Sequence, residues 1–549
     1  MLGYHKERTM AKSTFQQFYE TEQKFPHNLC IRFEHKKLTY HQFLLRVRLT
    51  AKKLVALGVK PHDVVTVSIP NCIEAAELFY AISAIGAISY NLHPLTPPEK
   101  LKQYMDFAGS KLLFCLWNVA YKNRDYFPKE YQIVGINPYI HVNGIKSSYF
   151  RAVGKKRPNL WRYDKLPHAR DFSVYTPDEK EDAVYLNTGG TDGEPKVVRL
   201  SHDAINYLGS VSYHLIGGPY RDIKLFTVIP LFHVFGLGMG LHTPLSFGGS
   251  TVLMLKFHPK AAIQEIKKGH TNTLLGVPAI YNAILSKKEF YGTFLKKQLV
   301  AYVGGDNVPQ NLIDRWNDTM RTFDSDARLY VGYGSTEAMV CNVNTLGHRS
   351  RKGSIGRPQP GMKNKIVDPA TGQDLPPFTP GEICIAGPMI MSGYLHDENA
   401  TKRTLVADKN GEIWLHTGDY GYLDNDGYLY FRQRLKRVVK VNGETLCPAD
   451  VEAVILQMPE IYACYVYGVP NERKGQAFRV AAVVRHGKDA VSEEEAKRLI
   501  FARIRAALPP SYEPDKVIIM KKLPRTGVGK VDIRWFSEHP DPEEEGLNR

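Results

Sequence analysis

The sequence lacks the features that would place it in several special classes of protein. Its seven cysteines are scattered over 549 residues without a CxxC spacing, and their number is odd. This usage argues against a disulfide framework and a structural zinc site, and it favours a reducing compartment. Segment 1–20 also lacks the apolar run of a secretory signal peptide. We therefore expect a cytoplasmic protein.

Only one stretch is apolar and long enough to be weighed as a membrane span. Residues 226–250 contain no Lys, Arg, Asp or Glu and could cross a bilayer by length alone. The same stretch contains Pro230, Pro244, His233 and His242 together with several glycines. This composition favours a buried strand, loop and helix around a pocket. We expect no transmembrane segment and leave peripheral membrane contact as an open alternative.

Acidic residues are fewer than basic residues in this sequence. Asp and Glu number 56 against 72 Lys and Arg, so the net charge is +16. A surplus of this kind suits nucleic acid, an anionic membrane surface, or polyanionic small molecules. One basic run, 432–440, is not surrounded by an RNA- or DNA-binding module. We therefore expect no nucleic-acid partner and favour a polyanionic small molecule.

The hydrophobic pattern alternates between helical and strand-like segments. Residues 44–57 and 75–85 have the spacing of helices, whereas 64–69 and 87–90 read as strands. Such alternation predicts an α/β architecture with largely parallel sheets.

The length and a change of character along the chain predict more than one domain. Single cores rarely grow beyond about 250–300 residues. Near Arg434 the chain becomes a small basic α/β segment, and the last residues are acidic and poor in apolar side chains. We predict a large N-terminal domain over 1–433, a small C-terminal domain over 434–536, and a loose acidic tail over 537–549.

A loop rich in glycine and threonine follows one of the predicted strands. Its sequence is Thr188-Gly-Gly-Thr-Asp-Gly-Glu-Pro-Lys196. Backbone N–H groups, hydroxyls and a lysine in such a loop can hold a polyphosphate. It is not a Walker A motif, because Pro195 stands where that motif has glycine. Taken alone, the loop is weak evidence, and an ordinary surface loop would be the default interpretation.

Further segments carry chemistry-bearing residues at fixed spacings. They are Gly304-Gly-Asp306, Gly332-Tyr-Gly-Ser-Thr-Glu337, Leu415-His-Thr-Gly-Asp419, Arg434-Leu-Lys-Arg437 with Asn442-Gly443, and Pro524-Arg-Thr-Gly-Val-Gly-Lys530. Any one of them could be an incidental turn. In this order, however, they resemble the adenylate-forming (AMP-binding) superfamily, in the branch of acyl-CoA synthetases and coumarate-CoA ligases. Weaker matches such as Ser392-Gly-Tyr394 extend the resemblance over nearly the whole chain.

The resemblance implies a fold, a reaction and a set of cosubstrates. The fold is a large N-terminal domain of β-sheets flanked by helices with a small, mobile C-terminal α+β domain. The reaction is ATP-dependent activation of a carboxylic acid to acyl-AMP with release of pyrophosphate, followed by transfer to coenzyme A. The implied cofactors are ATP, Mg²⁺ and coenzyme A.

The family's functional positions map onto individual residues of this sequence. Glu337 would bind Mg²⁺ as a hard oxygen ligand, Thr336 would contact the α-phosphate, and Lys530 would bridge the acid and the α-phosphate. The remaining nucleotide contacts fall on Thr188, Gly189, Gly190, Thr191, Gly193, Lys196, Gly304, Gly305, Asp306, Gly332, Tyr333, Gly334, Asp419 and Arg434. Lys436 would be the pivot between the two domains, and Gly443 would lie beside the incoming pantetheine.

Two residues depart from the family pattern. Asp192 stands where the phosphate loop usually has Thr or Ser, and a carboxylate there should repel a triphosphate unless Mg²⁺ or a lysine intervenes. Arg437 replaces an acidic residue that commonly follows the pivot. Asp192 places the ATP affinity of the loop in doubt, and the consequence of Arg437 is not evident from the sequence.

The identity of the acid is constrained only loosely. His233 would line the acid pocket by its family position, among apolar neighbours and glycines. No acidic residue stands where amino-acid-activating relatives meet the substrate ammonium. We expect a fatty acid first and an aryl acid next. Two alternatives stay open: an acyl-AMP ligase that loads a separate carrier protein, and a non-catalytic nucleotide or acyl binder.

Overall fold

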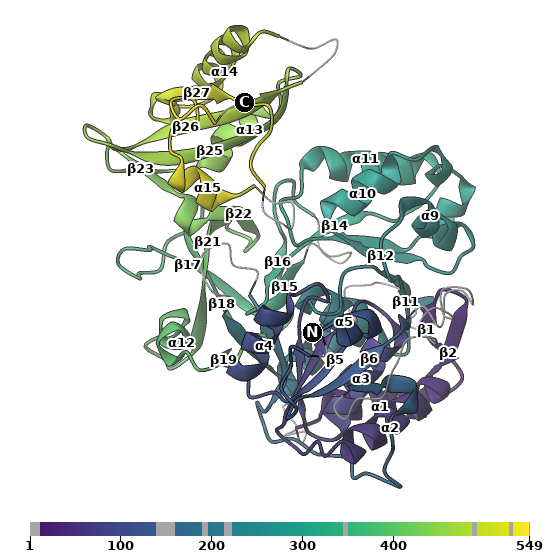
Figure 1. The fold of residues 1–549 in the computed structure, drawn as a ribbon. Coiled ribbons are helices and arrows are strands. Elements are labelled where there is room, and N and C mark those ends of the chain that lie inside the picture. Colours follow the sequence, from purple (N-terminus) through teal and green to yellow (C-terminus); the bar gives the residue numbers. More distant parts are fainter. Residues whose placement is uncertain are drawn as a thin grey trace. The chain divides into compact units, whose positions relative to one another are not determined.

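A computed structural model describes residues 11–123, 125–138, 160–188, 196–212, 222–343, 350–485, 491–525 and 531–547. The chain forms two compact units (Figure 1). The first comprises Met1–Thr188, Pro195–Asn364 and Ile385–Leu415, and the second comprises Gly189–Glu194, Lys365–Cys384 and His416–Arg549.

A nine-stranded sheet forms one part of the first unit. Its spatial order is β16 (Arg357–Pro358), β15 (Met339–Val343), β14 (Leu329–Ser335), β13 (Val300–Val303), β12 (Thr273–Gly276), β10 (Lys224–Thr227), β11 (Ser250–Leu253), β1 (Leu29–Phe33) and β2 (Lys36–Thr39). The strands from β14 to β1 are parallel, and the pairs at both edges are antiparallel. Parallel strands need helical crossovers. Three helices contribute to one hydrophobic cluster with this sheet, namely α9 (Pro259–Lys267), α10 (Pro278–Leu285) and α11 (Gln310–Thr322).

An eight-stranded sheet forms the other part of the first unit. Its order is β19 (Gly393–Tyr394), β9 (Val197–Ser201), β8 (Asp182–Asn187), β4 (Ile88–Asn91), β3 (Val64–Ser68), β5 (Leu112–Leu116), β6 (Gln132–Ile136) and β7 (Leu160–Arg162). The strands from β8 to β7 are parallel, whereas β9 and β19 are antiparallel to their neighbours. The α/β expectation with largely parallel sheets is confirmed.

The first unit contains further helices besides α9, α10 and α11. They are α1 (Thr14–Lys24), α2 (Tyr40–Ala56), α3 (Ile73–Ala84), α4 (Pro98–Phe107), α5 (Trp117–Lys122), α7 (His202–Ser212), α8 (Thr243–Ser246) and α12 (Glu398–Thr404), with 3₁₀ turns η2 (Tyr163–Lys165), η6 (Lys288–Phe290) and η7 (Thr293–Lys297). Helix α2 starts with a capping box, in which Thr39 and Gln42 satisfy each other's backbone N–H groups. The four elements expected within 44–90 correspond to α2, β3, α3 and β4.

The long uncharged stretch is divided among three elements and does not form one continuous helix. It contains β10, the π-helix η5 (Phe235–His242) and α8. Glycines allow η5 to pack closely, since a Cβ atom on Gly236 would lie 2.2 Å from the Pro230 carbonyl oxygen. The expectation of a buried strand, loop and helix is confirmed. In the part of the chain that is described, no helix has both the length and the apolarity to cross a membrane.

The second unit contains most of one five-stranded sheet and all of a second sheet. The first of these sheets comprises β17 (Lys363–Val367), β18 (Gly381–Ala386), β21 (Ile413–Leu423), β20 (Leu405–Ala407) and β22 (Leu429–Arg434). Strand β20, the starts of β17 and β21 and the end of β18 belong to the first unit. The second sheet comprises β24 (Glu444–Leu446), β23 (Val439–Val441), β26 (Gly475–Val484), β25 (Ile461–Asn471) and β27 (Lys516–Ile519). Its helical elements are η8 (Leu435–Arg437), α13 (Pro448–Ile455), α14 (Glu493–Ala507), η9 (Pro510–Tyr512) and α15 (Ile533–Glu538).

Both faces of the second sheet are covered by apolar side chains. Alternate residues of β26 point to opposite faces, so Val480 packs in a cluster with α13 and α14, and Ala481 packs in a cluster with Phe536 of α15. The second unit begins earlier than the expected boundary at residue 434. The reason is that hairpin β21–β22 packs with α13, through an ion pair between Arg432 and Asp450 with 2.6 Å between Nη1 and Oδ1.

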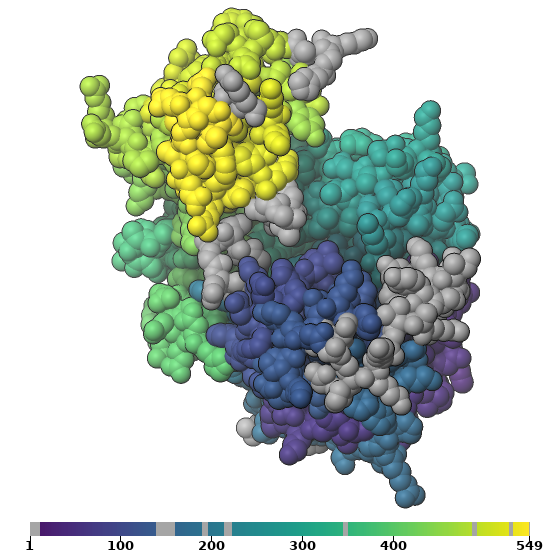
Figure 2. Space-filling model, viewed as in Figure 1, coloured from purple at the N-terminus to yellow at the C-terminus, as the bar shows by residue number. Residues whose placement is uncertain are grey.

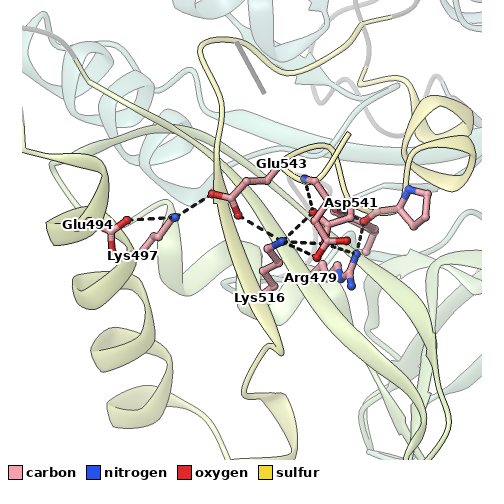
Figure 3. A network of polar contacts seen from close by, with 9 residues as sticks. Arg479, Glu494, Lys497, Lys516, Asp541 and Glu543 are labelled. Carbon is pink, nitrogen blue, oxygen red and sulfur yellow. Dashed lines mark hydrogen bonds and ion pairs between the residues drawn. The ribbon is translucent and has the colours of Figure 1, made fainter. Parts of the chain in front are cut away.

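The C-terminal residues differ from the loose tail that the sequence suggested. Figure 3 shows a chain of alternating charges that holds them against the sheet. The Asp541 carboxylate is buried and lies 3.0 Å from Nη1 of Arg479 and 2.8 Å from Nζ of Lys516. Glu543 continues the chain to Lys497, at 3.0 Å. In the space-filling view the last residues, in yellow, lie against the rest of this unit (Figure 2).

The titration of Asp541 reflects this environment. Burial alone would raise the pKa of its carboxyl group, but the hydrogen bonds and charges of Lys516 and Arg479 outweigh burial and lower the pKa. A carboxyl group with a lowered folded-state pKa stabilises the fold above its unfolded-state pKa, and that contribution is lost as the pH falls. The acidic tail is therefore ordered because basic residues of the same unit neutralise it.

Replacing Asp541 with alanine should destabilise the C-terminal sheet by about 1–3 kcal/mol, because the hydrogen bonds and charge contacts of its carboxylate with Lys516 and Arg479 are lost. The measurement is amide hydrogen exchange of β26 and β27 in the full chain at neutral pH. Glu494→Ala serves as the control, since its side chain is 86% exposed and should change stability by less than about 0.5 kcal/mol. Equal protection in both variants would contradict the role given to Asp541.

Candidate functional site

The loop between β8 and β9 is closed at its base by a backbone hydrogen bond. The Thr188 N–H donates to the Lys196 carbonyl oxygen at 2.9 Å, next to the antiparallel pair of Asn187 and Val197. Thr188 and Lys196 therefore flank a hairpin loop, as the motif predicts. The other loop positions proposed for the nucleotide lie outside the described residues; they are Gly189, Gly190, Thr191 and Gly193, together with the divergent Asp192.

The hairpin between β14 and β15 presents Thr336 and Glu337 in its turn. A Cβ atom on Gly334 would lie 1.7 Å from the Met339 carbonyl oxygen, so only glycine fits there. Met339 itself has φ +54°, a left-handed backbone conformation that tightens the turn. Gly332 and Tyr333 lie on β14 immediately before the turn. The close backbone approach thus brings all six residues of the motif to one end of the strand.

Segment Gly304 to Asp306 lies beside this hairpin. It follows β13, which is parallel to β14, and a Cβ atom on Gly304 would lie 2.7 Å from the Gly332 carbonyl oxygen. Gly305 adopts φ +78°, and the Asp306 carboxylate accepts a hydrogen bond from the Asn307 N–H at 2.8 Å. The two glycine motifs therefore meet at the carboxyl ends of neighbouring parallel strands, where α/β sheets bind ligands.

These glycines serve different purposes. Gly304 is needed for the close approach of the two strands, whereas a Cβ atom on Gly332 would make ordinary van der Waals contacts, the nearest at 3.8 Å. Of the two, only Gly332 could carry a Cβ atom without a clash.

Tyr394 connects two of the predicted nucleotide contacts. Its hydroxyl group donates to Oε1 of Glu337 at 3.1 Å, and Nζ of Lys196 lies 4.8 Å from the centroid of its ring. In the sequence, Ser392-Gly-Tyr394 is only a weak motif, and it indicates no role for Tyr394. Strand β19 brings it to the site by pairing with Val198 of β9.

The Glu337 carboxylate has the chemistry of a magnesium ligand. It is a half-exposed hard oxygen donor, and among the described residues its hydrogen-bond partner is a neutral hydroxyl group and no cation pairs with it. Its negative charge is therefore not neutralised within this part of the chain. The residues present fit a Mg²⁺ ion that accompanies a polyphosphate.

His233 lies in an exposed turn before η5. Its backbone N–H donates to the Pro230 carbonyl oxygen at 3.1 Å, and its ring lies 4.7 Å from that of Phe232. Phe232 in turn contacts His93, which follows β4, with ring centroids 4.9 Å apart. Partial burial lowers the pKa of His93. His93 was missed because no local motif marks it.

In the second unit, Asp419 and Arg434 are paired across hairpin β21–β22. They occupy opposite positions in the ladder, and Nη1 of Arg434 lies 3.0 Å from Oδ1 of Asp419. The Asp419 side chain is 4% exposed and that of Arg434 is 60% exposed. The structure therefore brings these two predicted ribose contacts together.

Three potential metal ligands support the turn before Asp419. The ligand atoms of Glu382, Cys384 and His416 lie within 4.8 Å of one another. Glu382 accepts hydrogen bonds from the Gly418 N–H, at 3.0 Å, and interacts with Nδ1 of His416, at 2.9 Å. Burial raises the pKa of the Cys384 thiol well above its ordinary value. We interpret the trio as support for the turn, because both oxygens of Glu382 already have partners.

The divergent Arg437 has a structural explanation. Its guanidinium lies 2.6 Å from Oε1 of the half-buried Glu452, donates to the Val466 carbonyl oxygen at 3.2 Å, and lies 4.8 Å from the centroid of the Tyr465 ring. Partial burial raises the pKa of Glu452, and the charge of Arg437 opposes that shift. Arg437 thus contributes to the internal packing of the second unit.

The remaining predicted positions lie in this unit as well. Lys436 is exposed in η8, and Gly443, with φ +82°, forms with Asn442 the two-residue turn between β23 and β24. Lys530 lies outside the described residues. The segment that contains it is closed by an isolated antiparallel bridge between Arg525 and Val531.

Comparisons with known proteins agree with this arrangement. Residues 18–395 match the family described as AMP-binding enzyme, and residues 450–530 match the AMP-binding enzyme C-terminal domain. The chain is 27% identical to a long-chain-fatty-acid–CoA ligase of Bacillus subtilis, over 94% of this chain and 92% of that protein. It is 30% identical to 4-coumarate–CoA ligase 2 of Solanum tuberosum, over 90% and 87%.

Solved structures extend the agreement to the fold. ATP-bound MatB from Rhodopseudomonas palustris matches with a TM-score of 0.83 at 22% identity, over 97% of this chain and 99% of that one. The anthranilate CoA ligase AuaEII in complex with anthranoyl-AMP matches with a TM-score of 0.80 at 19% identity, over 98% and 99%. The expectation of a large sheet domain with a small C-terminal α+β domain is confirmed.

Replacing Arg437 with glutamate should destabilise the second unit by about 1.5–3 kcal/mol, because its hydrogen bonds to a charged partner are lost and two carboxylates would then share a half-buried site without a cation. Urea unfolding followed by circular dichroism and by hydrogen exchange of β25 tests this. Arg498→Glu is the matched control, since Arg498 is 71% exposed and its surface pair is worth at most about 1 kcal/mol. Wild-type stability of Arg437→Glu would refute the structural role.

Proposed function

This chain belongs to the AMP-binding enzyme family, and on that premise we propose that it is an ATP-dependent acid–CoA ligase. It would join a carboxylic acid to AMP with release of pyrophosphate and then pass the acyl group to coenzyme A. The observation that carries the proposal is the convergence of Lys196 and Glu337 on Tyr394. The Tyr394 side chain thus contacts both a lysine suited to binding phosphate and a carboxylate suited to binding Mg²⁺.

The proposed reaction requires the carboxylate and ATP to be aligned and their negative charges to be neutralised. A carboxylate is a poor electrophile because its leaving group would be oxide. Attack of the carboxylate on the α-phosphate of ATP forms a mixed anhydride, and the bond to pyrophosphate breaks. In phosphoryl chemistry of this kind, positioning and preorganised charge supply most of the acceleration.

Individual side chains would contribute the contacts to the nucleotide. Lys196 would bind phosphate oxygens, Thr336 would donate to the α-phosphate, and Glu337 would hold Mg²⁺. Bound Mg²⁺ would neutralise phosphate charge and orient the triphosphate. Asp419 would accept hydrogen bonds from both ribose hydroxyl groups, because a carboxylate offers two acceptor oxygens to a vicinal diol.

The roles of the C-terminal residues rest on the family resemblance. Lys530 would bridge the substrate carboxylate and the α-phosphate during adenylation. Lys436 would then act as the pivot that moves the small domain before thioester formation, and Gly443 would lie beside the pantetheine. The exposure of Lys436 in a short 3₁₀ turn is compatible with a pivot.

We propose a fatty acid as the substrate class and an aryl acid as the next candidate. The support is the similarity to both a long-chain-fatty-acid–CoA ligase and a 4-coumarate–CoA ligase. The contact of Phe232 with His93 is compatible with an uncharged tail.

The first test is pyrophosphate release with ATP, Mg²⁺ and a panel of fatty, aryl and amino acids, with and without coenzyme A. We expect release with one uncharged class of acid, acceleration by coenzyme A, and a thioester detected by mass. Release that coenzyme A does not affect would favour transfer to a carrier protein. Absence of release with every acid would favour a non-catalytic binder, and Asp192→Thr would then be the first reversion to make.

Replacing Lys530 with alanine should slow adenylation by at least ~100-fold, as expected for the loss of one preorganised charged donor. The measurement is single-turnover formation of acyl-AMP. Lys521→Ala is the control, because Lys521 is an exposed lysine of the same unit and should leave the rate unchanged. Adenylation at the wild-type rate in Lys530→Ala would refute the role of this lysine.

A further inference from the structure

We infer that Tyr394 is a positioning residue that holds Glu337 and Lys196 in their working arrangement for a Mg²⁺-bound polyphosphate. This inference rests on the proposed function and adds a residue to it. Tyr394 belongs to β19, whereas Glu337 and Lys196 come from two other segments far away in the sequence.

The side chain of Tyr394 has two separable parts. Its hydroxyl group donates to Oε1 of Glu337 at 3.1 Å, which restricts the rotation of the carboxylate. Its ring face lies 4.8 Å from Nζ of Lys196, within the range of a cation–π interaction. The hydroxyl group therefore orients Glu337, the proposed metal ligand, and the ring orients Lys196, the proposed phosphate ligand.

The backbone holds Tyr394 in place on several sides. The Met391 N–H donates to the Glu337 carbonyl oxygen at 2.7 Å, and the Ser392 N–H donates to the Arg199 carbonyl oxygen at 2.9 Å. The Tyr394 N–H donates to the Thr401 hydroxyl group at 2.9 Å. Segment 391–395 thus joins the β14–β15 turn to strand β9, independently of the Tyr394 side chain. Removing the hydroxyl group should leave this framework intact.

The chemistry of the Tyr394 side chain suits its position. A phenol hydroxyl group is an uncharged donor, so it donates to Glu337 without cancelling the negative charge of the carboxylate. A lysine at this position would hold the carboxylate but would compete with Mg²⁺.

The test is the affinity of the full chain for ATP, measured by calorimetry with and without Mg²⁺. Tyr394→Phe removes the hydroxyl group only, so we expect ATP affinity to fall about threefold to tenfold with Mg²⁺ and less than about twofold without it. Tyr394→Leu also removes the ring, so we expect a further loss of about threefold that does not need Mg²⁺.

A double variant separates positioning from a general loss of structure. In a Glu337→Ala background, Tyr394→Phe should cause no further loss of Mg²⁺-dependent affinity, because its target is already absent. Tyr281→Phe is the matched control: its buried hydroxyl group donates to the Tyr302 carbonyl oxygen at 2.7 Å, in the core of the same unit. It should leave the Mg²⁺ dependence unchanged.

The outcomes distinguish this inference from the proposed function. A wild-type chain that binds ATP, together with a Tyr394→Phe variant of equal Mg²⁺-dependent affinity, would overturn the inference alone. Equal losses with and without Mg²⁺ in Tyr394→Phe would also overturn it, because they would indicate a purely structural role. A wild-type chain that does not bind ATP would overturn the proposed function and the inference together.

Discussion

The antiparallel pairing of the two-residue strand β19 with β9 is the constraint on which the site of the first unit depends. Through it, Gly393 and Tyr394 lie opposite Arg199 and Val198, next to the strand that begins after Lys196. A two-residue strand has little stability of its own. It is held because neighbouring backbone groups bond to the β14–β15 turn, so three segments are joined at one place.

Close backbone approach is the second condition for this arrangement. The turn that presents Glu337 exists because Gly334 lets the Met339 carbonyl oxygen approach, and β13 meets β14 because Gly304 has no side chain. The motif glycines therefore serve packing first. Contact with a nucleotide would use surfaces that this packing has already fixed.

The second unit is organised by neutralising charge. Arg437 compensates the half-buried Glu452, and Lys516 with Arg479 compensates Asp541 (Figure 3). A buried charge without a partner costs far more than an exposed one. These basic residues are thus committed to internal ion pairs.

The amino-acid sequence alone determined the α/β class, the existence of a small C-terminal domain, and the motifs with Lys196, Glu337 and Asp419. These are encoded by local spacing, hydrophobic period and short turns, so they can be read without coordinates. The link through Tyr394, the pairing of Arg437 with Glu452 and the anchoring of Asp541 were decided only by the tertiary structure. Each of them joins residues from segments separated in the chain, and only the pairing of strands and the packing of helices establishes which side chains meet.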